Sequence, residues 1–127
     1  MAVTTKNLLA QSADVVYTLT QEFPGLDVAV TMQTIFGAGC KFFAIQIDNT
    51  NNSSSNSYFK IWTSATATIG TDTPSVILMA DAGAKVQYTF DTSFSLSQAH
   101  GVVTTTAGTA GATGPQGTVT VKLLMET

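Results

Sequence analysis

Hydrophobic and polar residues alternate along several short stretches of this chain, with the period of two expected of a strand that has one buried face. Val86, Tyr88 and Phe90 alternate with polar neighbours, and Val119 to Met125 repeats the pattern. No helix longer than a turn or two is indicated, although over residues 7–16 a helix competes with a strand. The pattern predicts about eight short strands, at residues 13–20, 28–33, 43–48, 58–63, 75–79, 86–91, 102–106 and 119–125.

Glycine, proline, asparagine and aspartate separate these strands, as turns require. Between residues 58 and 91, three strands are divided by Gly70-Thr-Asp-Thr-Pro74 and by Asp81-Ala-Gly83, so the segment reads as a meander or as part of a two-sheet sandwich. We therefore predict an all-β fold, an antiparallel β-sandwich or jelly roll. The chain fits a single domain, 1–127, with a loose N-terminal arm at 1–12 and a glycine-rich loop at 107–117.

Charge is sparse and excludes one class of partner. Charged residues form 10% of the chain, against about 25% in soluble domains. The cations are five scattered lysines, and the net charge is −3. Nucleic acid binding needs clustered Lys or Arg, so we expect none. A surface of hydroxyls and amides is compatible with burial in a large assembly.

The start of the chain carries only a short apolar run, Leu8-Leu9-Ala10, which is too short for a signal peptide or a membrane span. We expect a complete product, beginning at Met1, that is made in the cytoplasm and has no membrane partner. The single cysteine, Cys40, has no disulfide partner within the chain, and we interpret it as a small buried apolar residue.

Reactive side chains are few, so no enzymatic activity is predicted. His100 is the only histidine and is interpreted as a surface or turn imidazole beside Gly101. One His and one Cys do not make a zinc site, which needs about four ligands. The loop that begins at Asp48 lacks the glycine and the glutamate of an EF-hand, having Ser53 and Phe59 at those positions. We therefore expect no cofactor and no metal.

Two polar loops are candidates for contact. The Asn49–Ser57 loop, with Asn51 and Asn52, is interpreted as solvated. Gly108, Gly111 and Gly114 follow each other at every third position, too briefly for a collagen helix. We interpret this loop as a flexible hairpin, as an interface loop, or as a segment that becomes ordered only against a neighbouring subunit.

The strand at 58–63 is apolar on both faces, since Tyr58 and Trp62 alternate with Phe59 and Ile61. One face fills the core, and the other needs a cover. Three alternatives stay open for Trp62: packing within the chain, a subunit interface, and stacking against a sugar ring. Lys60 is expected to lay its methylenes along the aromatic rings and to keep its amine in water.

The succession YFKIW, GTDTP, SVILM, AGAKVQYTF and a terminal Gly/Thr loop, over residues 58–121, resembles small structural proteins of tailed bacteriophages. The resemblance implies a virion protein that acts by binding alone: a capsid decoration or cement protein, or else a small tail or fibre component. The implied partners are the major capsid protein or other virion proteins, and a homo-oligomer, with a trimer favoured and a dimer possible.

The candidate interface residues lie in the apolar strand and the two polar loops. They are Tyr58, Lys60, Trp62, Asn51, Asn52, Gly108, Gly111 and Gly114. The alternative from another class is a carbohydrate-binding module, with Trp62 and Tyr58 as its stacking platform and the Asn/Ser loop as its source of hydrogen bonds.

Overall fold

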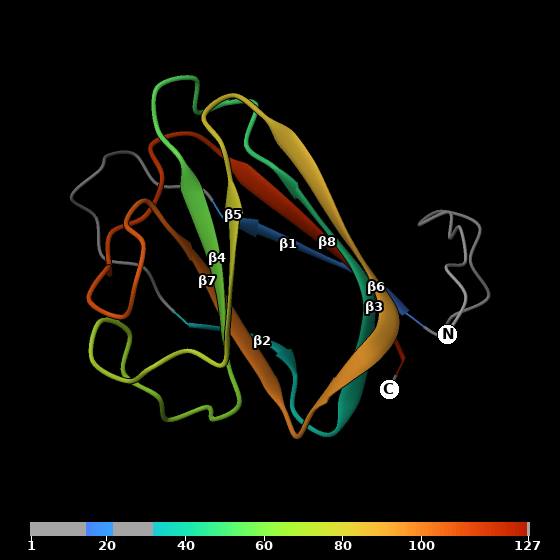
Figure 1. Ribbon diagram of the computed structural model, residues 1–127. Coiled ribbons are helices and arrows are strands. Elements are labelled where there is room, and N and C mark those ends of the chain that lie inside the picture. Colours follow the sequence, from blue (N-terminus) through green and yellow to red (C-terminus); the bar gives the residue numbers. More distant parts are fainter. Residues whose placement is uncertain (1–14, 22–31, 127) are drawn as a thin grey trace.

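The chain forms two antiparallel four-stranded sheets packed face to face (Figure 1). The computed structural model describes the backbone of residues 15–21 and all of residues 32–126. The strands are β1 (Val15–Gln21), β2 (Gln33–Phe36), β3 (Cys40–Asp48), β4 (Ser57–Trp62), β5 (Val76–Ala80), β6 (Lys85–Leu96), β7 (Ala99–Thr104) and β8 (Val119–Glu126). The all-β prediction, with about eight short strands, is confirmed.

The strand order is that of a jelly roll. One sheet runs β1-β8-β3-β6 and the other β2-β7-β4-β5. The chain thus behaves as one long hairpin folded over: β4 pairs with β5 at its tip, and β1 pairs with β8 at its open end, where Val15 lies opposite Met125. Successive pairs fall alternately in the two sheets, and this double wrapping defines a jelly roll. The segment 58–91 is therefore part of a two-sheet sandwich, because β6 leaves the sheet of β4 and β5.

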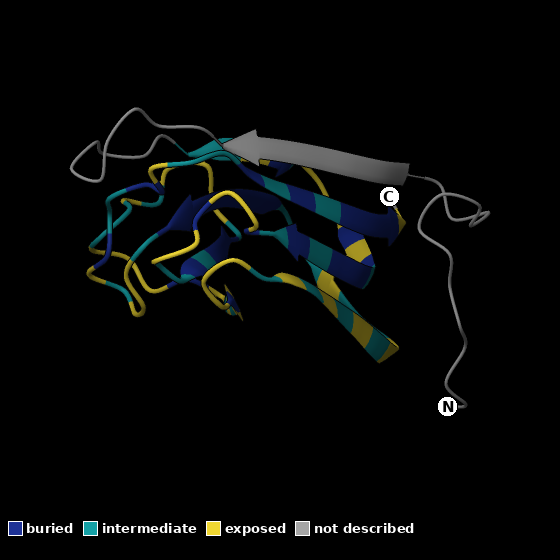
Figure 2. Cartoon of the chain, turned by 90° about the horizontal axis from the view of Figure 1, so that it is seen from above, coloured by how far each residue is buried: buried dark blue, intermediate teal, exposed yellow. Residues whose placement is uncertain are grey.

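The core lies between the two sheets and uses the faces that the alternation predicts. On β8, Val119, Val121, Leu123 and Met125 are all buried in it, and from the opposite sheet Phe59 and several other residues meet them. Along β6, half-buried and exposed positions alternate over most of the strand (Figure 2). Burying a large apolar side chain contributes about 1.5–3 kcal/mol, so this layer provides most of the fold's stability.

A β-bulge in β3 corrects one predicted face. Strict alternation places Phe43 on the side of Ile45 and Ile47, but the pairing register shifts between Phe42 and Ala44. The shift puts Phe42 in the core with the two isoleucines, while Phe43 packs in a separate small cluster with Ala44. An extra residue in one strand exchanges the two faces, as a bulge does.

Other bounds differ modestly from the prediction. The strand predicted at 86–91 is longer than expected, since β6 continues to Leu96. The strand predicted at 28–33 lies outside the described residues except for its end, where β2 begins at Gln33. The predicted arm, 1–12, also lies outside them.

Candidate functional site

The outer face of the β2-β7-β4-β5 sheet holds most of the predicted site residues. On β4, Phe59 and Ile61 point into the core, so Tyr58, Lys60 and Trp62 point outward. Two loops lie on this side of the molecule, 63–75 after β4 and 105–118 after β7 (Figure 1). These loops decide which side chains a partner can reach.

Lys60 is completely buried beneath the glycine-rich loop. Its Nζ donates hydrogen bonds to the carbonyl oxygens of Gly108, at 2.6 Å, and Gly111, at 3.1 Å. The ion pair found among the described residues joins Lys41 and Glu126 instead. Burial lowers the pKa of Lys60, and the two carbonyl dipoles oppose that effect by favouring the ammonium form. The prediction of an amine in water was wrong, because the carbonyls that replace water come from 48 and 51 residues away.

The glycine-rich loop is held by its own chain. A Cβ on Gly111 would lie 2.5 Å from the Thr106 carbonyl oxygen and 3.0 Å from the Lys60 Nζ, so only glycine lets the loop approach this closely. The Thr105 amide donates to the Thr113 carbonyl at 3.0 Å, and Gly114 is buried. Contacts within the chain hold the loop in this conformation, and its interpretation as a flexible hairpin, an interface loop or a segment ordered by a neighbouring subunit stays a prediction.

A second set of buried polar groups ties the Asn49–Ser57 loop to two other segments. Asn49 is fully buried; its Nδ2 donates to the carbonyls of Ser55 and Asp81, each at 3.0 Å, and its Oδ1 accepts from Ser57 Oγ at 2.7 Å and from Asn52 Nδ2 at 3.0 Å. Asn52 reaches Gly117, whose amide donates to its Oδ1 at 2.8 Å.

The interpretation of this loop as solvated was therefore wrong for Asn49, Asn52 and Ser57. It holds for Asn51, which is exposed and donates to the Thr118 carbonyl at 3.3 Å. Sequence reasoning missed Asn49 altogether. Its one signal was its position, directly after the long apolar strand.

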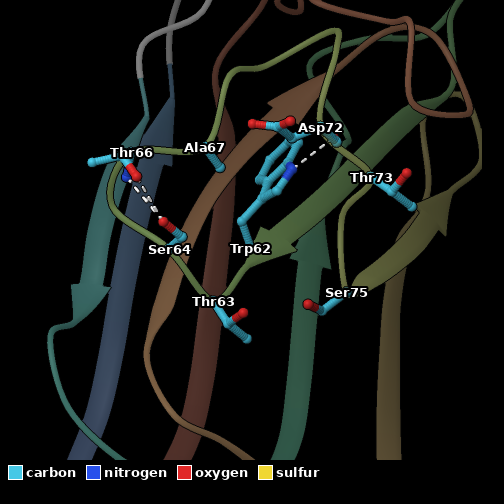
Figure 3. Close-up of a pocket in the computed structure, with 8 residues that line it drawn as sticks. All are labelled: Trp62, Thr63, Ser64, Thr66, Ala67, Asp72, Thr73 and Ser75. Carbon is cyan, nitrogen blue, oxygen red and sulfur yellow. Dashed lines mark hydrogen bonds between the residues drawn. The ribbon is translucent and has the colours of Figure 1, made fainter.

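Trp62 packs within the chain, the first of the three alternatives left open for it. Its side chain is 2% exposed and lies in a small cluster with Val102 and with Ala67 and Ile69 of the 63–75 loop. Its Nε1 donates to the Asp72 carbonyl at 2.9 Å, as Figure 3 shows. The enclosed ring leaves no flat face on which a sugar could stack.

His100 is also buried, which corrects its interpretation as a surface imidazole. It lies in β7 opposite Trp62 and is 2% exposed. Its Nδ1 is 3.1 Å from Thr34 Oγ1 and its Nε2 is 2.8 Å from Gln98 Oε1. The contact of Nδ1 with Thr34 ties β7 to β2, and the contact of Nε2 with Gln98 fixes the ring locally, against the turn that precedes β7. Thr34 is 66 residues away from His100, so sequence spacing does not indicate this contact, whereas Gln98 is only two residues away.

The remaining titratable groups form no reactive arrangement in the part of the chain that is described. Cys40 is buried in the core, as predicted, and burial raises the pKa of its thiol, which makes it less reactive. Hydrogen bonds from the hydroxyl and amide of Thr50 lower the pKa of Asp48. Among residues 32–126, no three His, Cys, Asp or Glu side chains gather as metal ligands would.

The candidate interface residues fall into two groups. Asn51 and Gly108 are exposed and Tyr58 is half-buried, so a partner can reach them. The other five are buried within the protomer: Lys60, Trp62, Asn52, Gly111 and Gly114. A partner cannot reach these five residues in this conformation.

Tyr58 continues into an accessible apolar patch that the sequence reasoning did not single out. Met79 lies opposite Tyr58 on β5 and Ile77 opposite Lys60, and both are 40% exposed. We call Tyr58, Ile77 and Met79 the β4–β5 patch. It carries no exposed charge, because the lysine at its centre is buried. The Tyr88 hydroxyl donates to the Met79 carbonyl at 2.5 Å and so occupies part of the free edge of β5.

Comparison of the chain with protein-family models, curated proteins and solved structures finds no match. Over the described ranges, no helix has the length and apolar character needed to cross a membrane.

Proposed function

We propose that this protein is a non-enzymatic structural component of a tailed-phage virion, a decoration or cement protein that binds the outside of the capsid shell and stabilises it. The observation that carries the proposal is the use of its buried polar groups. Lys60, Asn49, Asn52 and His100 all hold loops and strands of their own chain together. These four side chains stabilise the fold itself, as suits a molecule that has to persist and to be bound.

The jelly roll adds support by analogy, since viral capsid and lectin domains use this architecture. The jelly roll also occurs in proteins of many other functions, so this analogy supports the virion proposal only at the level of the fold. The resemblance of residues 58–121 to small phage structural proteins points the same way.

Binding requires an accessible apolar surface, and the β4–β5 patch provides one. Ile77 and Met79 offer area that a protein partner would bury, and no exposed charge on the patch has to be desolvated. The partner we propose is the major capsid protein. A homo-oligomer, a trimer in preference to a dimer, would present several such patches at once, and multivalency would compensate for the modest area of each.

The rival carbohydrate-binding function loses its main support. It needed Trp62 and Tyr58 as an exposed platform, and the Trp62 ring is enclosed. The tail or fibre alternative stays within the proposal, and copy number in the particle separates it from decoration.

The deciding experiment is quantitative mass spectrometry of virions purified from the phage that encodes the chain. A copy number comparable with that of the major capsid protein supports decoration, and a few copies per particle supports a tail or fibre part. Absence from purified virions would overturn the proposal.

Shell binding is then tested by sedimentation of purified shells with the added protein. The double variant Ile77→Lys, Met79→Lys should lose most binding, because it places two charges in the proposed contact. Gln87→Lys, Thr89→Lys, at two exposed positions of β6 in the other sheet, is the matched control and should bind normally. Equal binding by both variants would exclude the patch as the contact.

A further inference from the structure

The 63–75 loop forms one side of a small pocket beside Trp62. The pocket is open to solvent, and the proposed function does not use it. Its volume is about 200 Å³. The lining residues are Trp62, Thr63, Ser64, Thr66, Ala67, Asp72, Thr73 and Ser75, drawn in Figure 3. Five of these eight carry hydroxyl groups and one carries a carboxylate, so polar groups form most of the wall beside the aromatic ring.

The pocket is already formed by hydrogen bonds within its loop. The Asp72 amide donates to the Thr68 carbonyl at 2.9 Å, and the Asp72 carboxylate accepts from the Thr68 amide at 2.7 Å. The Ser75 amide donates to the Ile61 carbonyl at 2.7 Å and closes the loop onto β4. A ligand would therefore not have to order these walls, which lowers the entropic cost of binding.

Several hydroxyls on the wall are available. Those of Thr63, Thr73 and Ser75 make no hydrogen bond to the described part of the chain, whereas Ser64 and Thr66 bond to each other at 3.0 Å. In Figure 3 the hydroxyl oxygens of Thr63 and Ser75 are turned toward the space between them. Each of these groups can both donate and accept, and the Asp72 carboxylate adds an acceptor.

We propose that this pocket binds one neutral sugar unit of a glycan. A sugar ring offers hydroxyls that donate and accept in turn, which matches such a lining. Anionic sugars are disfavoured by the Asp72 charge. The volume is below the roughly 300–1,000 Å³ of pockets for drug-sized ligands, which limits the occupant to about one ring. The contact differs from ring stacking, since the indole is a wall and not a platform.

Trp62 is the only tryptophan of the chain, so its fluorescence reports on this pocket alone. The probes are glucose, galactose, mannose and N-acetylglucosamine, each titrated into the full-length protein. At least one should shift or quench the emission saturably, with a Kd of about 1–10 mM, because few hydrogen bonds form and water competes. A linear response, or none, with all four sugars would overturn the proposal.

Variants then assign the binding. Thr63→Val with Ser75→Ala removes two free hydroxyls and should weaken binding at least tenfold, while Thr92→Ala, at an exposed position of β6, should bind like wild type. Asp72→Asn keeps an acceptor for the Thr68 amide and should reduce the discrimination against glucuronate. Unchanged affinity in the double variant would contradict the site. If that variant has an altered circular dichroism spectrum, Thr63→Val alone replaces it, and an unchanged affinity is again decisive. Shell sedimentation of the same variants separates this inference from the proposed function.

Discussion

Burial of Lys60 has two opposite effects on the stability of the fold. A buried ammonium loses its hydration, and here two backbone carbonyls from the glycine-rich loop replace part of it. The same bonds hold that loop against the outer face of β4. The side chain therefore couples the conformation of residues 105–118 to the sheet.

Replacing Lys60 by methionine removes the donor and keeps a similar length. We expect a loss of about 2 kcal/mol in the free energy of unfolding, since the buried Gly111 carbonyl is left without a partner. Urea unfolding followed by Trp62 fluorescence measures it. Lys85→Met, at an exposed position of β6, should change stability by less than about 0.5 kcal/mol. An Lys60→Met variant as stable as wild type would mean that relief of charge burial offsets the lost bonds.

The difference in stability between wild type and Lys60→Met is expected to depend on pH. The folded-state pKa of Lys60 is below its ordinary value of 10.5. Between these two pH values the unfolded chain therefore binds more protons than the folded one. The burial cost is fully present below the folded-state pKa and declines as pH rises through it toward 10.5. A neutral amine still has two N–H donors for the two carbonyls. The stability of wild type relative to Lys60→Met should therefore increase in the alkaline range. A difference independent of pH would contradict desolvation of the ammonium.

Gly111 is the second residue whose identity the packing dictates. In Gly111→Ala, the added Cβ meets the Thr106 carbonyl at 2.5 Å, so the backbone has to move and the Lys60 bonds weaken. We expect a melting temperature lowered by roughly 5–15 °C, corresponding to about 2–3 kcal/mol. Gly37→Ala, with no atom within 4 Å of its added Cβ, is the control and should melt like wild type. Equal melting temperatures of the two variants would show that the loop backbone can shift to accept the Cβ at little cost in stability.

At the scale of elements, buried hydrogen bonds tie two of the described loops, 49–57 and 105–118, to the rest of the jelly roll. Asn49 lies where β3 ends and bonds to the loop before β4, to the turn after β5 and to Asn52. Asn49→Ala should cost about 2–4 kcal/mol, because several buried groups lose their partner together. Denaturant unfolding checks this against Asn51→Ala, an exposed residue of the same loop, which should cost less than about 1 kcal/mol. Similar losses in both would exclude a special role for Asn49.

Sequence patterns predicted the strands well, since alternation is a local property. On β8 every second residue from Val119 to Met125 is in the core as expected, and the register on β3 failed only where a bulge intervenes. Burial of polar residues was not predictable. Lys60 and His100 find partners 48 to 66 residues away, and no periodicity within one strand indicates what lies above it. The exposure of the candidate site residues was therefore predicted wrongly where a polar side chain is buried and forms hydrogen bonds within the chain.

At the scale of the whole molecule, assembly is the property that the proposed function requires. Light scattering of the purified protein at several concentrations should give the mass of a trimer, or of a dimer, because a low-charge surface with an apolar patch favours self-association as well as shell binding. A mass of one chain at every concentration would contradict the homo-oligomer and leave the shell as the only source of multivalency.

Removing residues 1–12 tests the contribution of the N-terminal arm to shell binding. We expect the truncated protein to keep the melting temperature of the full chain and to bind shells less tightly, since the sequence predicts residues 1–12 as a loose arm, which we propose as a further shell contact. Shell sedimentation and thermal unfolding are compared on the same preparation. Loss of binding and of stability to the same extent would assign the arm to the fold instead.

The pairing of Val15 with Met125 has one more consequence. The first and last described strands are neighbours in one sheet and run antiparallel, so the beginning of β1 and the end of β8 lie at the same corner of the domain. A short peptide bridge between them would make the backbone continuous, and the chain could then be reopened at the exposed Thr66 without separating any paired strands. Circular permutation would thus give a protein with the same two sheets but with new ends beside Trp62. Cargo fused to those ends would be displayed on the opposite part of the molecule.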